Sequence, residues 1–175
     1  HPVTGVRFEN NVIDGIEANF FETVITDMNH YRSAEQFMNA GFEHGRCFWS
    51  FGENGKVAAD DTEDAKRIGV VDAQNGSAVY QGLFVKADKP CIFRAKVCAS
   101  DKGFRMFVKD LETQELIAAR AIENAEWDEL EMEFSVPANG NYHIGIENAK
   151  AEKGTARIAN AMLMGNCEAA LEYDN

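Results

Sequence analysis

Short stretches of alternating apolar and polar residues, separated by tight-turn dipeptides, run through most of this chain. Asn54-Gly55, Asn75-Gly76 and Asn139-Gly140 are dipeptides that two-residue hairpin turns prefer. Alternation with period two places apolar side chains on one face of a strand and polar side chains on the other. Five segments alternate in this way, at 78–85, 93–97, 104–109, 130–136 and 142–147. Such a pattern is typical of antiparallel sheets with one buried face.

Further strands are expected near 37–43, 48–52, 67–72, 115–122 and 155–163, which brings the total to nine or ten. The many short strands predict an all-β fold, either a sandwich of two antiparallel sheets or a barrel.

The first 36 residues carry a mixed signal. Ile16, Phe20, Val24, Met28 and Tyr31 recur at helical spacing, yet 20–26 also has strand chemistry. We expect a strand near 3–8 followed by one helix, which makes this segment irregular or partly helical. The sequence therefore predicts an N-terminal segment over 1–36, a sandwich domain over 37–166 and a C-terminal tail over 167–175.

The charge balance limits the partners of the chain. Lys and Arg number 17 against 29 Asp and Glu, for a formal charge of −12 and an isoelectric point near 4.7. A nucleic-acid groove would need a basic footprint, so nucleic acid is not expected as a partner. No apolar run approaches the roughly 18–20 residues of a membrane-spanning helix.

The first residues and the cysteines bear on the processing and the redox state of the chain. The chain opens at His1-Pro2 without a basic and apolar leader, so we interpret it as a mature protein or a piece of a longer one. Cys91 and Cys98 lie seven residues apart on one expected strand, on opposite faces, and are not expected to bond to each other. The state of Cys47 and Cys167 is open.

Four motifs occur in a recognisable order. They are 39–45 with Phe48-Trp49, then 80–87 with 93–97, then Trp127 with 136–144, and finally 157–163. This series resembles the jelly-roll carbohydrate-binding modules of the group that includes families four, nine, sixteen and twenty-two. The resemblance covers about 37–164.

The resemblance implies a jelly-roll β-sandwich that binds a polysaccharide or oligosaccharide without catalysis. It also implies a secreted or cell-surface protein in which a linked catalytic domain degrades the polymer. The modules often hold a structural Ca²⁺ with the glutamate of the opening motif and an aspartate of the closing strand. Here these positions are Glu43 and Asn160. Because one of the two carboxylates is missing, whether the chain binds the ion stays open.

A set of polar side chains is expected to point away from the core. The ligand-binding candidates among them are Gln81, Arg94, Arg105, Phe107, His143 and Glu147. Arginine and lysine bind sugar hydroxyls well and uronic carboxylates better, so an acidic polysaccharide would suit them. The alternative is a solvated face on which Arg94, Lys96, Arg105 and Lys109 pair across strands with Glu131 and Glu133.

Trp49 is a second candidate, because a sugar can stack its apolar face on an indole ring. The alternative is that Trp49 caps the core, and Trp127 is expected to be structural. The acidic stretch 60–64 lacks the spacing of a calcium loop and is expected to be a solvated loop.

No catalytic motif is present: G-x-S-x-G, H-E-x-x-H and the phosphate-binding P-loop pattern are all absent. We therefore do not expect an enzyme. Two other functions stay open: a structural or protein-interaction sandwich of a secreted multidomain protein, and a hydrolase or lyase built on the jelly roll.

Overall fold

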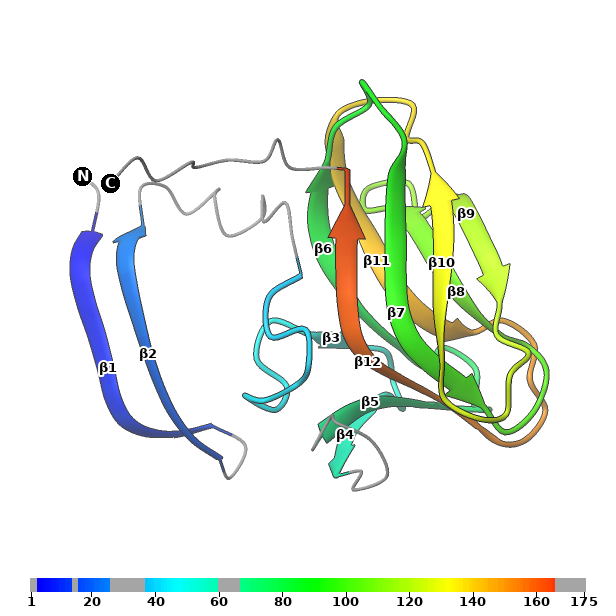
Figure 1. The fold of residues 1–175 in the computed structure, drawn as a ribbon, viewed down its shortest axis with the longest axis horizontal. Helices are drawn as coiled ribbons and strands as arrows, with labels where there is room; N and C mark the ends of the chain where they lie inside the picture. The colour runs from blue at the N-terminus through cyan, green and yellow to red at the C-terminus, as the bar shows by residue number, and fades with distance from the viewer. Residues whose placement is uncertain (1–2, 14–15, 26–36, 60–66, 166–175) are drawn as a thin grey trace.

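Two five-stranded antiparallel sheets stack face to face in the computed structural model, which describes residues 3–13, 16–25, 37–59 and 67–165 (Figure 1). The β6 sheet has the order β3-β6-β11-β8-β9, and the β7 sheet has the order β10-β7-β12-β5-β4. The strands of the β6 sheet are β3 (Ser50–Phe51), β6 (Ala78–Val85), β11 (Gly140–Asn148), β8 (Phe104–Asp110) and β9 (Leu116–Ala121). Those of the β7 sheet are β10 (Asp128–Phe134), β7 (Cys91–Ala99), β12 (Thr155–Met164), β5 (Arg67–Asp72) and β4 (Lys56–Ala59). The expectation of an all-β sandwich is confirmed.

The core lies between the sheets and follows the alternation in the sequence. In β7, Phe93, Ala95 and Val97 have no exposed surface, whereas Arg94 and Lys96 between them are half-buried. In β11, Ile144 and Ile146 face the same core. Burial of one large apolar side chain stabilises a fold by roughly 1.5–3 kcal/mol, so the alternation fixes which face of each strand is turned inward.

The N-terminal segment differs from its prediction. Val3–Ile13 (β1) and Ile16–Ile25 (β2) form an antiparallel hairpin, so the expected helix is wrong over 16–25. The pairing of Ile13 with Ile16 leaves Asp14-Gly15 as the connection, and Asp-Gly is a preferred dipeptide for a two-residue hairpin. β-branched and aromatic residues between 20 and 25 favour a strand over the helical spacing. The rest of the predicted helix and the tail at 167–175 lie outside the described residues.

Turns replace the strand that was expected over 37–43. Asn39 holds this loop, because its Nδ2 donates to the carbonyls of Gly45 and Cys47, both at 3.0 Å. Its Oδ1 accepts the backbone N–H of His44 at 2.9 Å. Asn39 has a φ of 52°, a left-handed conformation that asparagine tolerates better than most residues. The loop brings Trp49 over the core.

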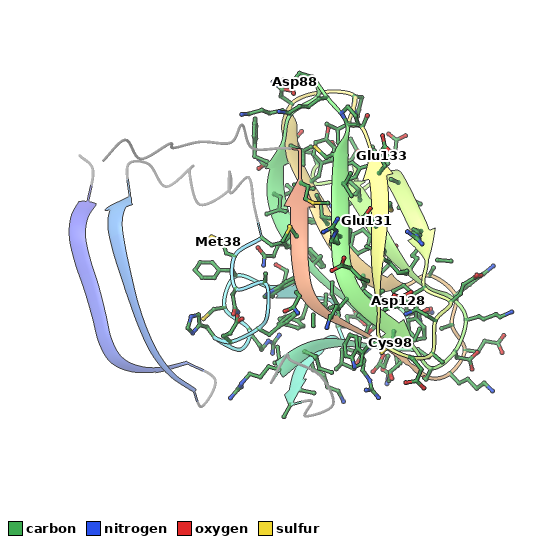
Figure 2. The ribbon with its side chains drawn as sticks, in the orientation of Figure 1. Met38, Asp88, Cys98, Asp128, Glu131 and Glu133 are labelled. Atoms are coloured by element: carbon green, nitrogen blue, oxygen red, sulfur yellow. The ribbon has the colours of Figure 1, made fainter. Side chains whose placement is uncertain are left out.

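The remaining strand predictions were close. The expected strands at 67–72, 115–122 and 155–163 correspond to β5, β9 and β12, and 48–52 contains the short β3. The short edge strand β4 was missed. Cys91 faces the core whereas Cys98, labelled in Figure 2, lies on the outer face of β7. The two thiols are therefore on opposite faces, as predicted.

Candidate functional site

The outer face of the β6 sheet gathers polar and aromatic side chains from three neighbouring strands. Residues opposite one another in antiparallel strands point to the same side of a sheet. The register places Tyr80, Gly145 and Phe107 in one row, and Gly82, His143 and Lys109 in the next. Glu147 is opposite Arg105. We call this surface the β6 face; its members are Tyr80, Gly82, Phe84, Arg105, Phe107, Lys109, Asn141, His143, Gly145 and Glu147.

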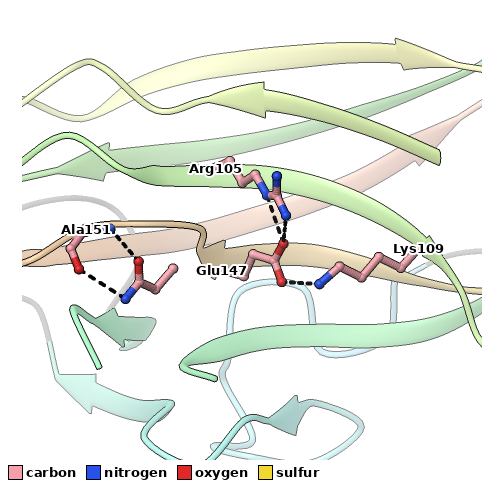
Figure 3. Close-up of polar contacts among 5 residues, drawn as sticks. Arg105, Lys109, Glu147 and Ala151 are labelled. Atoms are coloured by element: carbon pink, nitrogen blue, oxygen red, sulfur yellow. Dashed lines mark hydrogen bonds and ion pairs between the residues drawn. The ribbon is translucent and has the colours of Figure 1, made fainter. Parts of the chain in front are cut away.

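Three charged residues form one network on the β6 face (Figure 3). Arg105 donates to Glu147 Oε1 from Nε at 2.8 Å and from Nη2 at 2.6 Å. Lys109 Nζ donates to Glu147 Oε2 from the other side. The Glu147 side chain is only 10% exposed, and the two cations are 29% and 23% exposed. Both carboxylate oxygens are thus used, and the network holds one surplus positive charge.

The aromatic residues of the β6 face are layered. The Phe107 ring lies beneath its neighbours, with the Tyr80 ring edge-on at 6.2 Å and Lys109 Nζ 4.8 Å from its centroid. Phe107 is only 2% exposed, so the prediction that it is an exposed aromatic is wrong. Tyr80 is half-buried and packs against the His143 ring at 4.5 Å. The partly exposed aromatic residues of this face are therefore Tyr80, His143 and Phe84, which is opposite Asn141 in the register.

The surroundings of the His143 imidazole favour its neutral form. Burial lowers its pKa below the ordinary value of 6.5, and the positive charge of Lys109 lowers that pKa further. A neutral imidazole has one donor nitrogen and one acceptor nitrogen, which suits hydroxyl groups of a ligand.

Two glycines shape the β6 face differently. A methyl group at Gly82 would lie in ordinary van der Waals contact with the Leu111 side chain at 3.6 Å and with His143 at 3.9 Å, so a small side chain would fit there without displacing its neighbours. A methyl group at Gly145 would lie 2.6 Å from Tyr80 Cα, so this glycine permits the close approach of β6 and β11. Along the same strand, Asn141 Oδ1 is buried without a hydrogen-bond partner among the described residues.

Arg94 does not belong to this site. It lies on β7, in the opposite sheet, and its Nε donates to Glu131 at 2.7 Å while Glu129 lies at 3.6 Å. Figure 2 shows Glu131 and Glu133 along β10, the strand that pairs with β7. The alternation predicted an outward direction for Arg94 and Arg105 correctly, but consecutive strands of a sandwich can lie in different sheets. The alternative interpretation is confirmed for the pair of Arg94 and Glu131, whereas Arg105 and Lys109 bind Glu147 and not Glu131 or Glu133.

Two other candidates are buried on the core side. Gln81 is 3% exposed; its Oε1 accepts the Met38 backbone N–H at 3.1 Å and its Nε2 donates to the Met38 carbonyl at 2.6 Å. Trp49 is 6% exposed, stacks on Phe42 at 4.5 Å and donates to the Asn39 carbonyl at 2.8 Å. The prediction that Gln81 points outward is therefore wrong, and for Trp49 the structure agrees with the alternative that it caps the core.

Glu43 and Asn160 approach each other around Gly41. A methyl group at Gly41 would collide with Glu43 Oε1 and lie 3.3 Å from Asn160 Oδ1. Ca²⁺ takes six to eight oxygen ligands, and two are found here. In the described parts of the chain, no group of three or more His, Cys, Asp or Glu side chains gathers for a metal ion. Among the described side chains, Glu43 and Asn160 alone therefore do not complete the ligand set of a calcium ion.

Other features have structural or untested roles. Trp127 packs on Ile68, Val70 and Ala159 as a separate cluster, and its indole N–H is buried without a described partner. The acidic stretch 60–64 lies outside the described residues. In the described ranges, no helix is long and apolar enough to cross a membrane.

Comparison with known proteins finds similarity in structure only. No protein-family model matches the sequence, and no curated protein does. A family 16 carbohydrate-binding module superposes with a TM-score of 0.55 at 12% identity, covering 73% of this chain and 97% of that one. A family 61 module in complex with β-1,4-galactotriose gives a TM-score of 0.53 at 15% identity, with 73% and 96% covered.

The fold is that of carbohydrate-binding modules. The resemblance in the sequence motifs is therefore confirmed at the level of the fold. A larger protein matches in part: 75% of this chain superposes on an α-L-arabinofuranosidase with a TM-score of 0.54 at 12% identity. This chain spans 25% of the length of that enzyme. A fold shared at such low identity leaves function to the chemistry of the site.

Proposed function

We propose that this domain is a non-catalytic carbohydrate-binding module whose ligand lies across the β6 face. The observation on which the proposal rests is the pairing of the partly exposed Tyr80 with His143, beside Gly82, which carries no side chain that could cover the two rings. An aromatic surface stacks on the apolar face of a sugar ring, and polar groups at its border bind the hydroxyls. Here the border consists of Arg105, Lys109 and Asn141.

The chemistry of the border suits many hydroxyl groups. Glu147 fixes the directions of Arg105 and Lys109, because both bind its carboxylate from opposite sides. The remaining N–H groups of the two cations can donate to sugar oxygens, and the Asn141 Oδ1 without a described partner can accept a hydroxyl proton. Binding energies of about 4–8 kcal/mol are expected, which correspond to millimolar to micromolar affinity.

The proposed role is targeting. In a secreted or cell-surface protein, such a module would keep a linked polysaccharide-degrading domain close to its polymer and raise the effective concentration. The fold of the family 16 and family 61 modules, at near full length, supports a binding role rather than a catalytic one.

Affinity electrophoresis tests this proposal. The protein is run through gels that contain one soluble polysaccharide each, neutral or acidic, with and without calcium. We expect one class to retard the protein, and Tyr80→Ala or Gly82→Val to abolish the retardation. Arg94→Ala is the control, because Arg94 lies on the opposite sheet. Retardation that is unchanged in both β6-face variants contradicts the site, and no retardation by any polymer contradicts the function.

A further inference from the structure

One shared carboxylate holds the two cations of the β6 face together. Arg105 lies opposite Glu147 in the register of β8 and β11, and Lys109 lies further along the same face of β8. Both cations donate hydrogen bonds to Glu147, one to each carboxylate oxygen (Figure 3). Two positive charges and one negative charge are therefore in direct contact.

This network keeps donor groups for a ligand. Glu147 uses Nε and one N–H of Nη2 of Arg105, so the Nη1 group is left over. Lys109 gives one of its three ammonium donors to Glu147. The two side chains are 29% and 23% exposed, so a ligand on the β6 face can reach them.

The strands beside the network add no second carboxylate to this face. The edge strand β9 carries the exposed Ala121 opposite Arg105. Asp110, the next carboxylate along β8, is opposite the core residue Tyr142 and accepts the N–H groups of 112 and 113. Among the strand residues that the structure describes on the β6 face, Glu147 is thus the one anionic side chain.

The positive charge of the network extends to the aromatic residues. Lys109 is directly opposite His143 in the register, and its charge adds to burial in lowering the pKa of that imidazole. Residues opposite one another in antiparallel strands have Cα atoms about 5 Å apart. A sugar ring that rests on Tyr80 and His143 would therefore have the Lys109 ammonium at its border.

Removal of water decides which class of sugar suits this border. A bound ligand covers part of Arg105 and Lys109 and displaces water from a network with one surplus positive charge. A neutral hydroxyl offsets this cost only in part, whereas an oxyanion neutralises the surplus and accepts charge-assisted hydrogen bonds that are roughly twice as strong. The −12 charge of the whole chain acts mainly beyond contact, where salt screens it over about 8–10 Å.

We propose that the ligand of the β6 face is an acidic polysaccharide whose oxyanion binds Arg105 and Lys109. This inference rests on the proposed function and names the class of its ligand. The oxyanion is the carboxylate of a uronate or a sulfate ester, because arginine and lysine bind both through charge-assisted hydrogen bonds.

Matched pairs of polymers test the class of ligand. Affinity electrophoresis of the full chain compares polygalacturonate and alginate with their carboxyl-reduced forms, and dextran sulfate with dextran. We expect one acidic polymer to bind at least about tenfold more tightly than its neutral partner, and this preference to shrink as NaCl is added. Preference within a uronate pair identifies a carboxylate, and preference within the dextran pair identifies a sulfate.

A single charge removal tests the residues. Lys109→Met should weaken binding of the preferred acidic polymer about tenfold, because a charge-assisted hydrogen bond is lost. Lys153→Met is the matched control: it removes the same charge from a side chain that is 83% exposed, in the loop between β11 and β12, and should change affinity less than twofold. Unfolding in urea checks that both variants are folded.

The outcomes separate this inference from the proposed function. Equal affinity for acidic and neutral partners, or retardation by neutral polymers alone, overturns the acidic class and leaves the carbohydrate-binding function intact. Equal losses in Lys109→Met and Lys153→Met assign the preference to overall charge and overturn the role of the network. Retardation by no polymer of either kind contradicts the proposed function itself, and with it this inference.

Discussion

Replacing Glu147 with glutamine should destabilise the domain far more than the same change at Glu131. Glu147 accepts two hydrogen bonds from Arg105 and one from Lys109, all inside a site where its own side chain is 10% exposed. Glutamine keeps one acceptor oxygen and turns an amide NH₂ toward a cation. About two charge-assisted hydrogen bonds are lost, at roughly 1.5–3 kcal/mol each before solvent exposure of the partners is considered.

Because the cations are about a quarter exposed, we expect a net loss of about 2–3 kcal/mol for Glu147→Gln. That loss corresponds to a decrease in Tm of roughly 5–10 °C for a domain of this size. Glu131 binds Arg94 on the surface of the other sheet, where the side chains are 45% and 33% exposed, so Glu131→Gln should cost about 0–1 kcal/mol.

The assay is equilibrium unfolding in urea with calorimetry on both variants. The two substitutions have identical chemistry, so the sites differ in burial and in the number of cations that bind the carboxylate. Equal losses for Glu147→Gln and Glu131→Gln would refute the argument that the Arg105–Glu147–Lys109 network stabilises the β6 face.

Three further predictions concern single residues. Gln81→Leu should cost about 1–3 kcal/mol in urea unfolding, because the N–H and C=O of Met38 lose their partner; a neutral result would contradict this role. The pKa of His143 in the folded chain lies below 6.5, so the unfolded chain binds the proton more tightly. The free energy of unfolding should therefore fall as the pH is lowered from 6.5 through the folded pKa. In His143→Gln the free energy of unfolding should decrease less between pH 7.5 and 5.5, because this contribution is absent. Gly145→Ala should lower the free energy of unfolding by about 1–3 kcal/mol through contact with Tyr80, and an unchanged Tm would be inconsistent with that contact.

Alternation predicted the sandwich well, because burial of the apolar face determines which side of each strand is turned toward the core. It failed where a second signal competed with it. The parity of β6 already placed Gln81 with the core-facing Val79 and Leu83, and its polarity led to the wrong assignment. The same parity placed Tyr80 on the outer face, so the missed aromatic of the site was visible in the sequence.

Two other errors could be corrected only with the tertiary structure. Phe107 does point outward, but Tyr80 and Lys109 cover it, and strand parity does not report what a neighbouring strand places over a side chain. Arg94 and Arg105 are eleven residues apart on consecutive strands, yet the connection passes from one sheet to the other. In the hairpin of β1 and β2, Asp14-Gly15 was the overlooked signal.

Mapping an oligosaccharide on the backbone amides is the most direct test of the β6 face. A soluble fragment of the polysaccharide that retards the protein most is titrated into the labelled chain. The account predicts shifts at Tyr80, Gly82, His143 and Gly145, with β7 and β10 unaffected. Shifts confined to β7, β10 or β12, or no shifts with any fragment of the panel, would contradict a carbohydrate site on this face.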